Sequence, residues 1–435
     1  MNRLNIKTFS AIIFITLLFA NDVFAQNPGA VWMQYATPEE AGFSSDSLKS
    51  VAQLYEKNGA SALMVVYNGN VLISKGNITR RYDCHSMRKS LISALYGIYS
   101  SQGKINIHKT LKELCIDDTV KLTDQEQSAT IQDLLKARSG VYIPAFGEAQ
   151  SMKNERPARG SHPPDTFFYY NNWDFNVLGL IFQKETGLNL FKAFNESLAK
   201  PLQMEDFRPM DGRFWRDSSA STIYPKYDIK ISARDLARFG ALYCNDGIWD
   251  HTRILLKDWI TESFTPYSTI EHRTYKESYG YLWWIQMLDD SIPMYSALGW
   301  GGHILVVVPK YNLVLVKRHD TFCGSGGDTW TGMYIRKIFN ARISTPVSNP
   351  RLVPLEVRSR QMDFIDIPES SLKKYQQQIA LKGRTRNIEY TTYGLVFDDW
   401  FVLHPISATR FYIEDFGKYM FFKFVNDKPI FDKIE

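Results

Sequence analysis

Cysteine is scarce in this chain, which contains only Cys84, Cys115, Cys244 and Cys323 in 435 residues. No two of them form a Cys-x-x-Cys pair, and this excludes the usual zinc-ribbon and thioredoxin-type sites. The histidines and acidic residues also show no common metal-ligand spacing. We therefore expect neither a metal nor another cofactor. One or two disulfides could form in an oxidising compartment, but the sequence does not say which cysteines would pair.

The chain also lacks any concentrated run of positive charge. Its 51 Lys and Arg residues and 46 Asp and Glu residues give a formal net charge of +5, spread along the sequence. Binding to nucleic acid or to a membrane surface usually needs a cluster of basic residues. We therefore expect no nucleic-acid partner. With 44% hydrophobic and 22% charged residues, the composition is that of a globular protein with a sizeable core.

Long hydrophobic runs are absent except near the N-terminus. Residues 9–20 are nearly all apolar, follow Arg3 and Lys7, and precede Ala25, a small residue suited to cleavage. This pattern is typical of a secretory signal peptide. The run is shorter than the ~20 residues that span a bilayer, although an uncut N-terminal anchor is the alternative. We predict a signal peptide over residues 1–25, a secreted or periplasmic protein, and no membrane span after cleavage.

The hydrophobic pattern of the main part of the chain predicts strands at both ends and helices between them. Strands or hairpins are expected over residues 60–74, 279–286 and 304–317, and a loop over residues 149–165. Helical spacing covers residues 44–57, 86–103, 131–136, 175–186, 190–198 and 232–243. These elements predict an α+β domain in which one antiparallel sheet gathers both hairpins, with a helical insertion.

The last part of the sequence differs from the rest in its proline content and in its pattern of short β-type runs. Prolines punctuate residues 343–374, which we interpret as a linker after a first domain over residues 35–342. Residues 375–435 then alternate short β-type runs with turns, and this predicts a small, separate all-β domain. All candidate catalytic motifs precede this domain, so we expect it to take no part in catalysis.

The segment Ser86-Met87-Arg88-Lys89 contains residues that could carry out nucleophilic catalysis. A Ser and a Lys three residues apart lie on the same face of a helix, so the amine can reach the hydroxyl. A Ser hydroxyl needs a base to take its proton, and a buried Lys, whose pKa falls on desolvation, can be that base. Ser-x-x-Lys recurs elsewhere, but only Ser86 begins a long apolar helix that would hold both side chains inside a domain.

Two further segments could complete such a site. Tyr170 and Asn172 open a predicted helix, where a phenol could transfer protons and an amide could hold a substrate carbonyl. A helix cap with aromatic packing is the alternative. Residues 297–303 are rich in glycine and precede a predicted strand, so a backbone N–H there could point at an oxyanion. A bulge in the strand is the alternative, and His303 could face the site or pack inside.

The order Ser-x-x-Lys, Tyr-x-Asn and a glycine-rich strand resembles the serine β-lactamase and penicillin-binding-protein superfamily. Within it, the sequence is most similar to the class C-like branch, with its esterases and 6-aminohexanoate-oligomer hydrolases. Supporting segments are residues 131–140 (IQDLLKARSG), 170–179 (YNNWDFNVLG), 231–263 and 279–285 (YGYLWWI). The resemblance covers residues 35–342 and implies a β-lactamase-like antiparallel sheet flanked by helices, with a helical subdomain.

The resemblance also implies a role for each matching residue. Ser86 would be acylated, Lys89 would be the base, and Tyr170 would pass protons in both half-reactions. The substrate would contact Asn172, Gly299 and Trp300. The backbone N–H groups of Ser86 and Trp300 would form the oxyanion hole, and water would release the acyl group, as in other double-displacement hydrolases.

One segment departs from the family pattern. The strand motif Lys-Thr-Gly of penicillin-recognising members, or its His-containing version in relatives, is replaced here by Ala297-Leu298-Gly299. This triplet offers neither a cation nor a hydroxyl to the carboxylate of a β-lactam or a D-Ala-D-Ala peptide. We therefore expect a small-molecule ester or amide substrate. A β-lactamase or D,D-peptidase is the first alternative, and an inactive relative that binds peptidoglycan fragments or a partner is the second.

Overall fold

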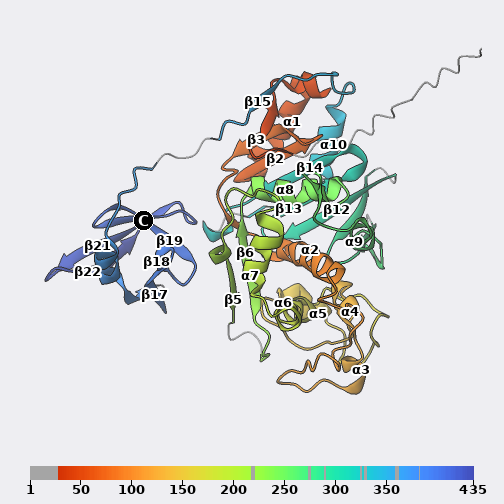
Figure 1. The fold of residues 1–435 in the computed structure, drawn as a ribbon, viewed down its shortest axis with the longest axis horizontal. Helices are drawn as coiled ribbons and strands as arrows, with labels where there is room; N and C mark the ends of the chain where they lie inside the picture. Colours follow the sequence, from red (N-terminus) through yellow and green to blue (C-terminus); the bar gives the residue numbers. More distant parts are fainter. Residues whose placement is uncertain are drawn as a thin grey trace, which may run out of the picture.

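The computed structural model of the protein describes residues 28–435, except for residues 217–220, 273–275, 289–290, 324–325, 328–330, 358–361 and 382. The predicted signal peptide over residues 1–25 therefore lies outside the described residues. No helix in the described part of the chain is long and apolar enough to cross a membrane. The chain forms a larger body of helices and strands, followed by a small β domain (Figure 1).

A ten-stranded sheet runs through the larger body, in the order β15-β1-β3-β2-β14-β13-β12-β11-β10-β9. All neighbouring strands are antiparallel except β1 and β3. The two predicted hairpins, β2–β3 and β13–β14, lie next to each other because β14 pairs with β2. The strands are β1 (Met33–Tyr35), β2 (Ala62–Tyr67), β3 (Asn70–Gly76), β9 (Ser268–Glu271), β10 (Lys276–Tyr279), β11 (Trp284–Leu288), β12 (Ile292–Gly299), β13 (His303–Val308), β14 (Leu313–Arg318) and β15 (Leu352–Pro354).

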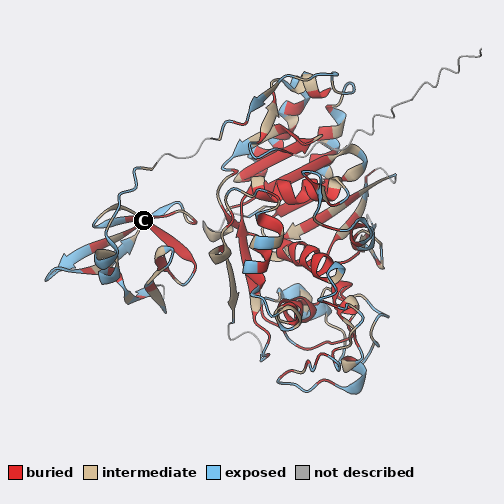
Figure 2. Cartoon of the chain, in the orientation of Figure 1, coloured by how far each residue is buried: buried red, intermediate tan, exposed pale blue. Residues whose placement is uncertain are grey.

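The central strands of this sheet are buried on both faces, which explains their unbroken apolar runs. Along β2, Met64 and Val66 point into one hydrophobic core, whereas Leu63 and Val65 point into the other. On one face lie α1 (Ser45–Asn58) and α10 (Thr331–Asn340), which contact each other. On the opposite face α8 (Ala233–Cys244) packs against β2, β13 and β14. Figure 2 shows the resulting buried layers.

A helical region lies beyond the face covered by α8 and contains the helix that begins after Ser86 (Figure 1). Its longer helices are α2 (Arg88–Ser101) and α6 (Asn172–Thr186), and its shorter ones are α3 (Asp124–Gln127), α4 (Ile131–Leu135), α5 (Gln150–Glu155), α7 (Leu190–Phe194) and α9 (Lys257–Ser263). Every residue of α2 from Arg88 to Tyr99 is buried. A helix that is buried all round belongs to the interior of a domain, and α2 therefore places its first turn in a desolvated environment.

Two small sheets complete the larger body. The first has the order β4-β6-β5 and consists of β4 (Tyr82–Asp83), β5 (Gly212–Trp215) and β6 (Lys226–Ile231). The second pairs β7 (Ile248–Trp249) with β8 (Thr252–Arg253). Because β4 ends three residues before Ser86, its pairing with β6 fixes the direction from which the chain enters α2.

The C-terminal domain is a seven-stranded antiparallel sheet in which each strand pairs with the next. Its strands are β16 (Gln377–Leu381), β17 (Arg384–Thr391), β18 (Gly394–Phe397), β19 (Phe401–Ser407), β20 (Arg410–Ile413), β21 (Lys418–Val425) and β22 (Lys428–Ile434). Residues such as Ile388, Phe411 and Ile413 form a hydrophobic core of its own. The predicted fold class, an α+β domain with a helical subdomain and a small all-β domain, is confirmed.

Some predicted boundaries differ from the structure. The strand expected over residues 279–286 is two strands, β10 and β11, because the chain turns at residues 280–283, where Gly280 packs directly against the backbone of Ser263. The loop expected over residues 149–165 contains α5. The segment interpreted as a linker, residues 343–374, contains β15, which pairs with β1, and the short helix α11 (Glu369–Leu372).

The close packing of α2 can be tested at Gly97. A Cβ atom there would lie 2.5 Å from two ring carbons of Trp259 and 2.7 Å from Leu255. We expect Gly97→Ala to lower the free energy of unfolding by about 1–3 kcal/mol, because the rigid indole must move, despite the better helix propensity of Ala. Urea denaturation measures this change. Gly332→Ala is the matched control, because a Cβ atom on Gly332, in α10, would meet no neighbouring atom within 4 Å, and it should not destabilise the protein. Equal losses in the free energy of unfolding of both variants would contradict the packing argument.

Candidate active site

Ser86 lies in a tight turn between β4 and α2. The turn is the 3₁₀ helix η2 (His85–Met87), closed by a hydrogen bond from the Met87 N–H to the Cys84 carbonyl at 3.0 Å. The prediction placed Ser86 on the α-helix itself, but the helix begins two residues later, at Arg88. Ser86 is half-buried, whereas Lys89 is almost completely buried. The hydroxyl is therefore accessible while its candidate base is shielded from water.

The amine of Lys89 lies within hydrogen-bond distance of three side-chain oxygens. Lys89 Nζ is 3.2 Å from Ser86 Oγ, 2.6 Å from Tyr170 Oη and 3.0 Å from Asn172 Oδ1. The amide oxygen can only accept a hydrogen bond, but both hydroxyls can donate one. A neutral amine has two hydrogens and one lone pair, so it satisfies this set by donating to two of the oxygens and accepting a hydrogen bond from one of the hydroxyls. The structure thus brings Ser86, Lys89 and Tyr170 together.

Burial shifts the pKa values of Lys89 and Tyr170 in directions that favour their neutral forms. Desolvation lowers the pKa of Lys89 well below its usual value of 10.5, and the neighbouring cations Arg88 and Lys226 lower it further. Desolvation also raises the pKa of Tyr170 to about 12, although a hydrogen bond with Ser86 opposes this shift. An uncharged amine can accept a proton from a hydroxyl, and an uncharged phenol can pass one on.

Tyr170 and Asn172 lie on either side of Asn171, the residue that caps the N-terminus of α6. Asn171 caps this helix by accepting a hydrogen bond from the Trp173 N–H at 3.1 Å, and its amide donates to the Val141 carbonyl at 2.6 Å. The same amide donates to Asp174 at 2.9 Å. The helix thus begins three residues before the predicted start at residue 175, and its cap ties it to the neighbouring loop.

Asn172 has partners other than the substrate contact predicted for it. Its side chain is buried, with Oδ1 beside Lys89 Nζ and Nδ2 donating to the Gly147 carbonyl at 2.6 Å. Both ends of the amide are therefore engaged within the protein. In this structure Asn172 orients the Lys89 amine.

The glycine-rich segment approaches the turn that carries Ser86. Residues 297–299 form the end of β12, and the turn at residues 300–302 connects it to β13. A Cβ atom on Gly299 would lie 2.7 Å from the Cys84 carbonyl oxygen, so only glycine allows this approach. The backbone N–H groups of Ser86 and Trp300, predicted as the oxyanion hole, therefore belong to two segments in contact. The side chain of Trp300 is 68% exposed, and its ring meets the His85 ring edge to face.

Sequence reasoning missed the residues that surround His85. Its Nε2 lies 2.8 Å from Thr321 Oγ1, and its backbone N–H donates to Asp83 at 2.9 Å. Burial lowers the pKa of His85, although Asp83 opposes this shift. His303 is fully buried, so it packs inside the protein and does not face the site. His85 and Thr321 are 236 positions apart, and no local pattern could have paired them.

Cys84 lies two residues before Ser86 and is buried. The thiols of Cys84, Cys115 and Cys244 are free, and burial raises the pKa of Cys84 to about 12. A thiol with such a pKa stays protonated and is a poor nucleophile at neutral pH. The described residues contain no group of three or more His, Cys, Asp or Glu side chains that could hold a metal ion. The Ser86 hydroxyl, the Lys89 amine and the Tyr170 phenol lie within hydrogen-bond distance of one another through Lys89.

Comparison with known proteins agrees with this geometry. The Beta-lactamase family model matches residues 50–319, which is more than half of the chain. Protein flp of Staphylococcus aureus strain N315 is 25% identical over 190 residues, which cover 37% of this chain and 38% of that protein. The match thus spans well under half the length of that relative. An uncharacterized protein of Alkalihalophilus pseudofirmus is 28% identical over 329 residues, covering 63% of this chain and 88% of that protein.

Solved structures with the same fold include hydrolases. A structure described as a 6-aminohexanoate-dimer hydrolase from Bacillus anthracis has a TM-score of 0.52 and 19% identity, covering 71% of this chain and 89% of its own. EstCE1, described as a hydrolase with promiscuous acyltransferase activity, has a TM-score of 0.50 and 14% identity, covering 71% of this chain and 99% of its own. At these identities the likeness shows a shared fold.

The close approach of Gly299 to the Cys84 carbonyl should be needed for activity. In Gly299→Ala, the added methyl group would push the end of β12 away from the Ser86 turn. We expect hydrolysis of a p-nitrophenyl ester to fall by about 10- to 100-fold, mainly in kcat, because a displacement of ~1 Å spoils the alignment of reacting groups. Gly29→Ala, whose Cβ would lie no closer than 4.0 Å to another atom, is the control and should match the parent. A fully active Gly299→Ala variant would show that this approach is not needed.

Proposed function

The chain belongs to the Beta-lactamase family, and from this premise we propose that it is a serine hydrolase that cleaves small-molecule esters or amides through an acyl-enzyme on Ser86. The observation that carries the proposal is the position of Lys89 Nζ, buried and within hydrogen-bond distance of both Ser86 Oγ and Tyr170 Oη. This is the arrangement that an activated nucleophile requires: a hydroxyl, a base within reach, and further groups that orient the base.

Acylation in this proposal moves one proton through the three side chains. Ser86 Oγ attacks the substrate carbonyl carbon while Lys89 accepts the Oγ proton. The backbone N–H groups of Ser86 and Trp300 donate hydrogen bonds to the negative charge that develops on the carbonyl oxygen. Tyr170 gives its proton to the leaving alcohol or amine and regains one from Lys89, which lies 2.6 Å away. The leaving group departs, and the acyl group remains on Ser86.

Deacylation reverses the proton path, with water in place of the leaving group. Tyr170 accepts a proton from the attacking water and passes its own proton to Lys89. The second tetrahedral intermediate collapses, and Lys89 returns the proton to Ser86 Oγ. The free acid leaves and the three side chains regain their starting protonation states. The neutral amine and the neutral phenol, favoured by burial, are the forms needed at the start of both steps.

The charges around the site favour a substrate that has no carboxylate. The triplet at residues 297–299 presents no cation to a substrate carboxylate. The cations near Lys89 have other partners: Arg88 donates to the His85 carbonyl at 3.1 Å, and Lys226 pairs with Asp228 at 2.5 Å. Esters or amides without a carboxylate therefore fit this site better than penicillins do. The exposed indole of Trp300 offers an apolar surface to such a substrate.

The hydrolases among the structures of the same fold support the proposal in general terms. One is described by its action on a 6-aminohexanoate dimer, an amide, and another by promiscuous acyl transfer, which proceeds through attack on an acyl group. We extend only the reaction class to this chain. The apolar run at residues 9–20 further supports export to the periplasm or the exterior, with cleavage near Ala25.

Pre-steady-state hydrolysis of p-nitrophenyl acetate tests the proposed function. We expect a burst of p-nitrophenol and an increase in intact mass by one acetyl group, because the acyl-enzyme forms before water releases it. Ser86→Ala should abolish the adduct and lower hydrolysis at least ~10³-fold. Ser101→Ala is the matched control: Ser101 begins a second Ser-x-x-Lys, but its hydroxyl donates to the Ile98 carbonyl at 2.7 Å, at the end of α2.

Three outcomes would count against the proposal. Undiminished hydrolysis by Ser86→Ala would assign the reaction to another residue. No adduct and no hydrolysis with the folded parent protein would favour the inactive, ligand-binding alternative. Hydrolysis of nitrocefin with a kcat/KM equal to or above that for the ester would favour the β-lactamase alternative, since it would show that a substrate carboxylate is accommodated without the missing cation.

A further inference from the structure

The C-terminal β domain takes up one side chain of the larger body, Phe322. This residue lies in the short 3₁₀ helix η6 (Thr321–Cys323), which follows β14. The centroid of its ring lies 5.9 Å from Trp400, 5.4 Å from Phe401 and 5.9 Å from Phe416. Phe322 thus packs against the hydrophobic core of the β domain. Edge-to-face aromatic contacts of this kind favour one ring position and restrain the backbone that carries it.

The residue before Phe322 contacts both backbone segments of the candidate oxyanion hole. Thr321 Oγ1 lies 2.8 Å from Nε2 of His85, the neighbour of Ser86 in the chain. The methyl group of Thr321 lies over Gly301, the neighbour of Trp300, so closely that a Cβ on that glycine would overlap it. Thr321 therefore touches both the turn of Ser86 and the turn of Trp300.

A chain of hydrogen bonds gives the Thr321 hydroxyl a fixed direction. Arg318 has only donors, and its Nε donates to His303 Nδ1 at 2.9 Å. Burial, with help from Arg318, lowers the pKa of His303 well below its usual value, so the neutral ring carries its hydrogen on Nε2, 3.4 Å from Thr321 Oγ1. The Thr321 hydrogen is then free for His85 Nε2. This leaves the hydrogen of His85 on Nδ1, which faces Asp83 Oδ2 at 3.5 Å.

His85 needs this support because of its backbone conformation. Its φ is +45°, in the left-handed region, which is unfavourable for a residue other than glycine. Such a conformation persists only where surrounding contacts hold it. Here the contacts are the hydrogen bonds of the His85 side chain with Thr321, of its N–H with Asp83 and of its carbonyl with Arg88. Loss of any of these hydrogen bonds would shift Ser86, the next residue in the chain.

Buried charges hold the β domain against the strands that lead to Ser86. Lys230, on β6, is fully buried, pairs with Asp415 at 3.1 Å and donates to the Trp400 carbonyl at 2.8 Å. Burial lowers the pKa of Lys230, but Asp415 and Asp211 oppose this shift. Lys230 pairs in the sheet with Asp83 of β4, the strand that leads to Ser86. The contacts of Lys230 with the β domain therefore lie one strand away from β4.

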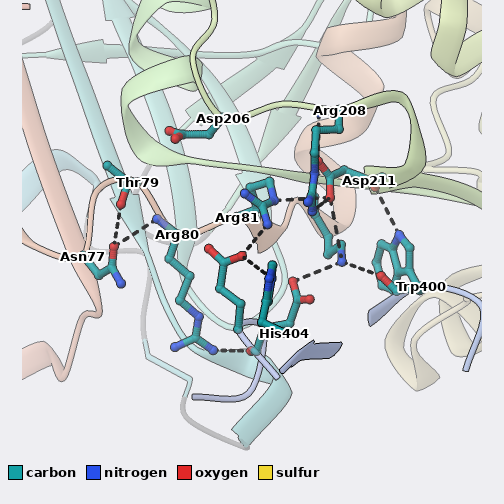
Figure 3. Close-up of polar contacts among 12 residues, drawn as sticks. Asn77, Thr79, Arg80, Arg81, Asp206, Arg208, Asp211, Trp400 and His404 are labelled. Atoms are coloured by element: carbon teal, nitrogen blue, oxygen red, sulfur yellow. Dashed lines mark hydrogen bonds and ion pairs between the residues drawn. The ribbon is translucent and has the colours of Figure 1, made fainter. Parts of the chain in front are cut away.

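Two arginines extend this contact along the chain that precedes Ser86. Arg81 pairs with Glu414 at 2.5 Å and with Asp211 at 3.3 Å. Arg80 pairs at 2.9 Å with Asp320, the neighbour of Thr321, and it also donates to the Asp415 carbonyl of the β domain. Figure 3 shows Arg81 and Asp211 near Trp400 of the β domain. Both segments that meet at His85, the one before Ser86 and the one containing Thr321, are thus fixed at this junction.

We propose that the C-terminal β domain is a positioning element of the active site: by seating Phe322 it holds Thr321 against His85, and through His85 it fixes the position of Ser86 relative to the Trp300 turn. This inference rests on the proposed function of Ser86. It replaces the expectation, drawn from the sequence, that the β domain takes no part in catalysis. Thr321, Phe322 and His85 act through Ser86 and are positioning residues.

Full-length variants of Thr321 and Phe322 test this inference. We expect Thr321→Val, which keeps the shape but removes the hydroxyl, to lower kcat for the ester and the rate of fluorophosphonate labelling by about 10- to 100-fold, because Ser86 is displaced. KM should change by less than about threefold, since substrate contacts remain. Thr321→Ser restores the hydroxyl and should recover activity to within about threefold of the parent. Thermal denaturation confirms that each variant is folded.

A double-mutant cycle tests whether Phe322 acts through Thr321. Phe322→Ala, or Phe322→Leu if the first variant does not fold, should lower kcat in the same way. In the double variant with Thr321→Val, kcat should equal that of Thr321→Val alone, since the hydrogen bond from Thr321 to His85, through which Phe322 acts, is already lost. Phe422→Leu is the control, because Phe422 packs against Tyr375 and Phe411 inside the β domain. It should lower the thermal midpoint but leave kcat unchanged.

The outcomes separate this inference from the proposed function. If the parent labels at Ser86 and hydrolyses esters but Thr321→Val matches it, the positioning role is wrong and the proposed function stands. Additive losses in the double variant, or an equal loss of kcat in Phe422→Leu, would also overturn the inference, since they would indicate a general effect on stability. If the folded parent neither labels nor hydrolyses esters, the proposed function itself fails.

Discussion

The rest of the site depends on one buried amine, Lys89 Nζ, surrounded by three side-chain oxygens. A charged lysine is unfavourable in a helix that is buried from Arg88 to Tyr99, so desolvation drives the amine toward its neutral form. The same burial keeps the Tyr170 phenol protonated. Asn172 supplies an acceptor that the amine can satisfy without losing its lone pair. In the proposed function these conditions together allow Lys89 to accept the Ser86 proton.

The fold supplies these conditions through its layers. The central sheet is buried on both faces, and α2 lies in the helical region beyond one of them, so its first turn is both rigid and desolvated. The end of β12 reaches the same turn because Gly299 has no side chain to keep it away from Cys84. In our proposal the β domain restrains His85 through Phe322 and Thr321. The end of β12 and the start of α2 thus meet at residues 84–86, and the terminal domain is linked to them through Phe322 and Thr321.

The sequence was informative where structure is local. Asn68-Gly69 marks the turn of the hairpin between β2 and β3, and both residues have positive φ. The Ser-x-x-Lys spacing placed Lys89 within reach of Ser86 because three residues span one helical turn. Tyr170 followed from the resemblance to a family. The α+β class followed from the order of strands and helices.

What the sequence could not show depends on contacts between distant segments. The engagement of Asn172 by Lys89 and Gly147 depends on tertiary packing, whereas the local sequence suggested either a helix cap or a substrate contact. At the break between β10 and β11, Gly280 lies against the backbone of Ser263 and Leu282 has a positive φ, and the contact with Ser263 joins segments distant in the chain. The contact of Thr321 with His85, and the charges at Lys230 that bind the β domain, join segments with no shared motif.

The pH dependence of Ser86 labelling tests the central claim most directly. Intact mass would follow the rate of reaction with a fluorophosphonate from about pH 5 to about pH 11. Protonated Lys89 cannot accept the Ser86 proton, so the rate should fall at low pH, rise through an apparent pKa well below 10.5, and then level off. Lys89→Met should remove this titration and nearly all labelling. A rate that keeps rising up to pH 10.5 and beyond, or that is unchanged in Lys89→Met, would contradict the account.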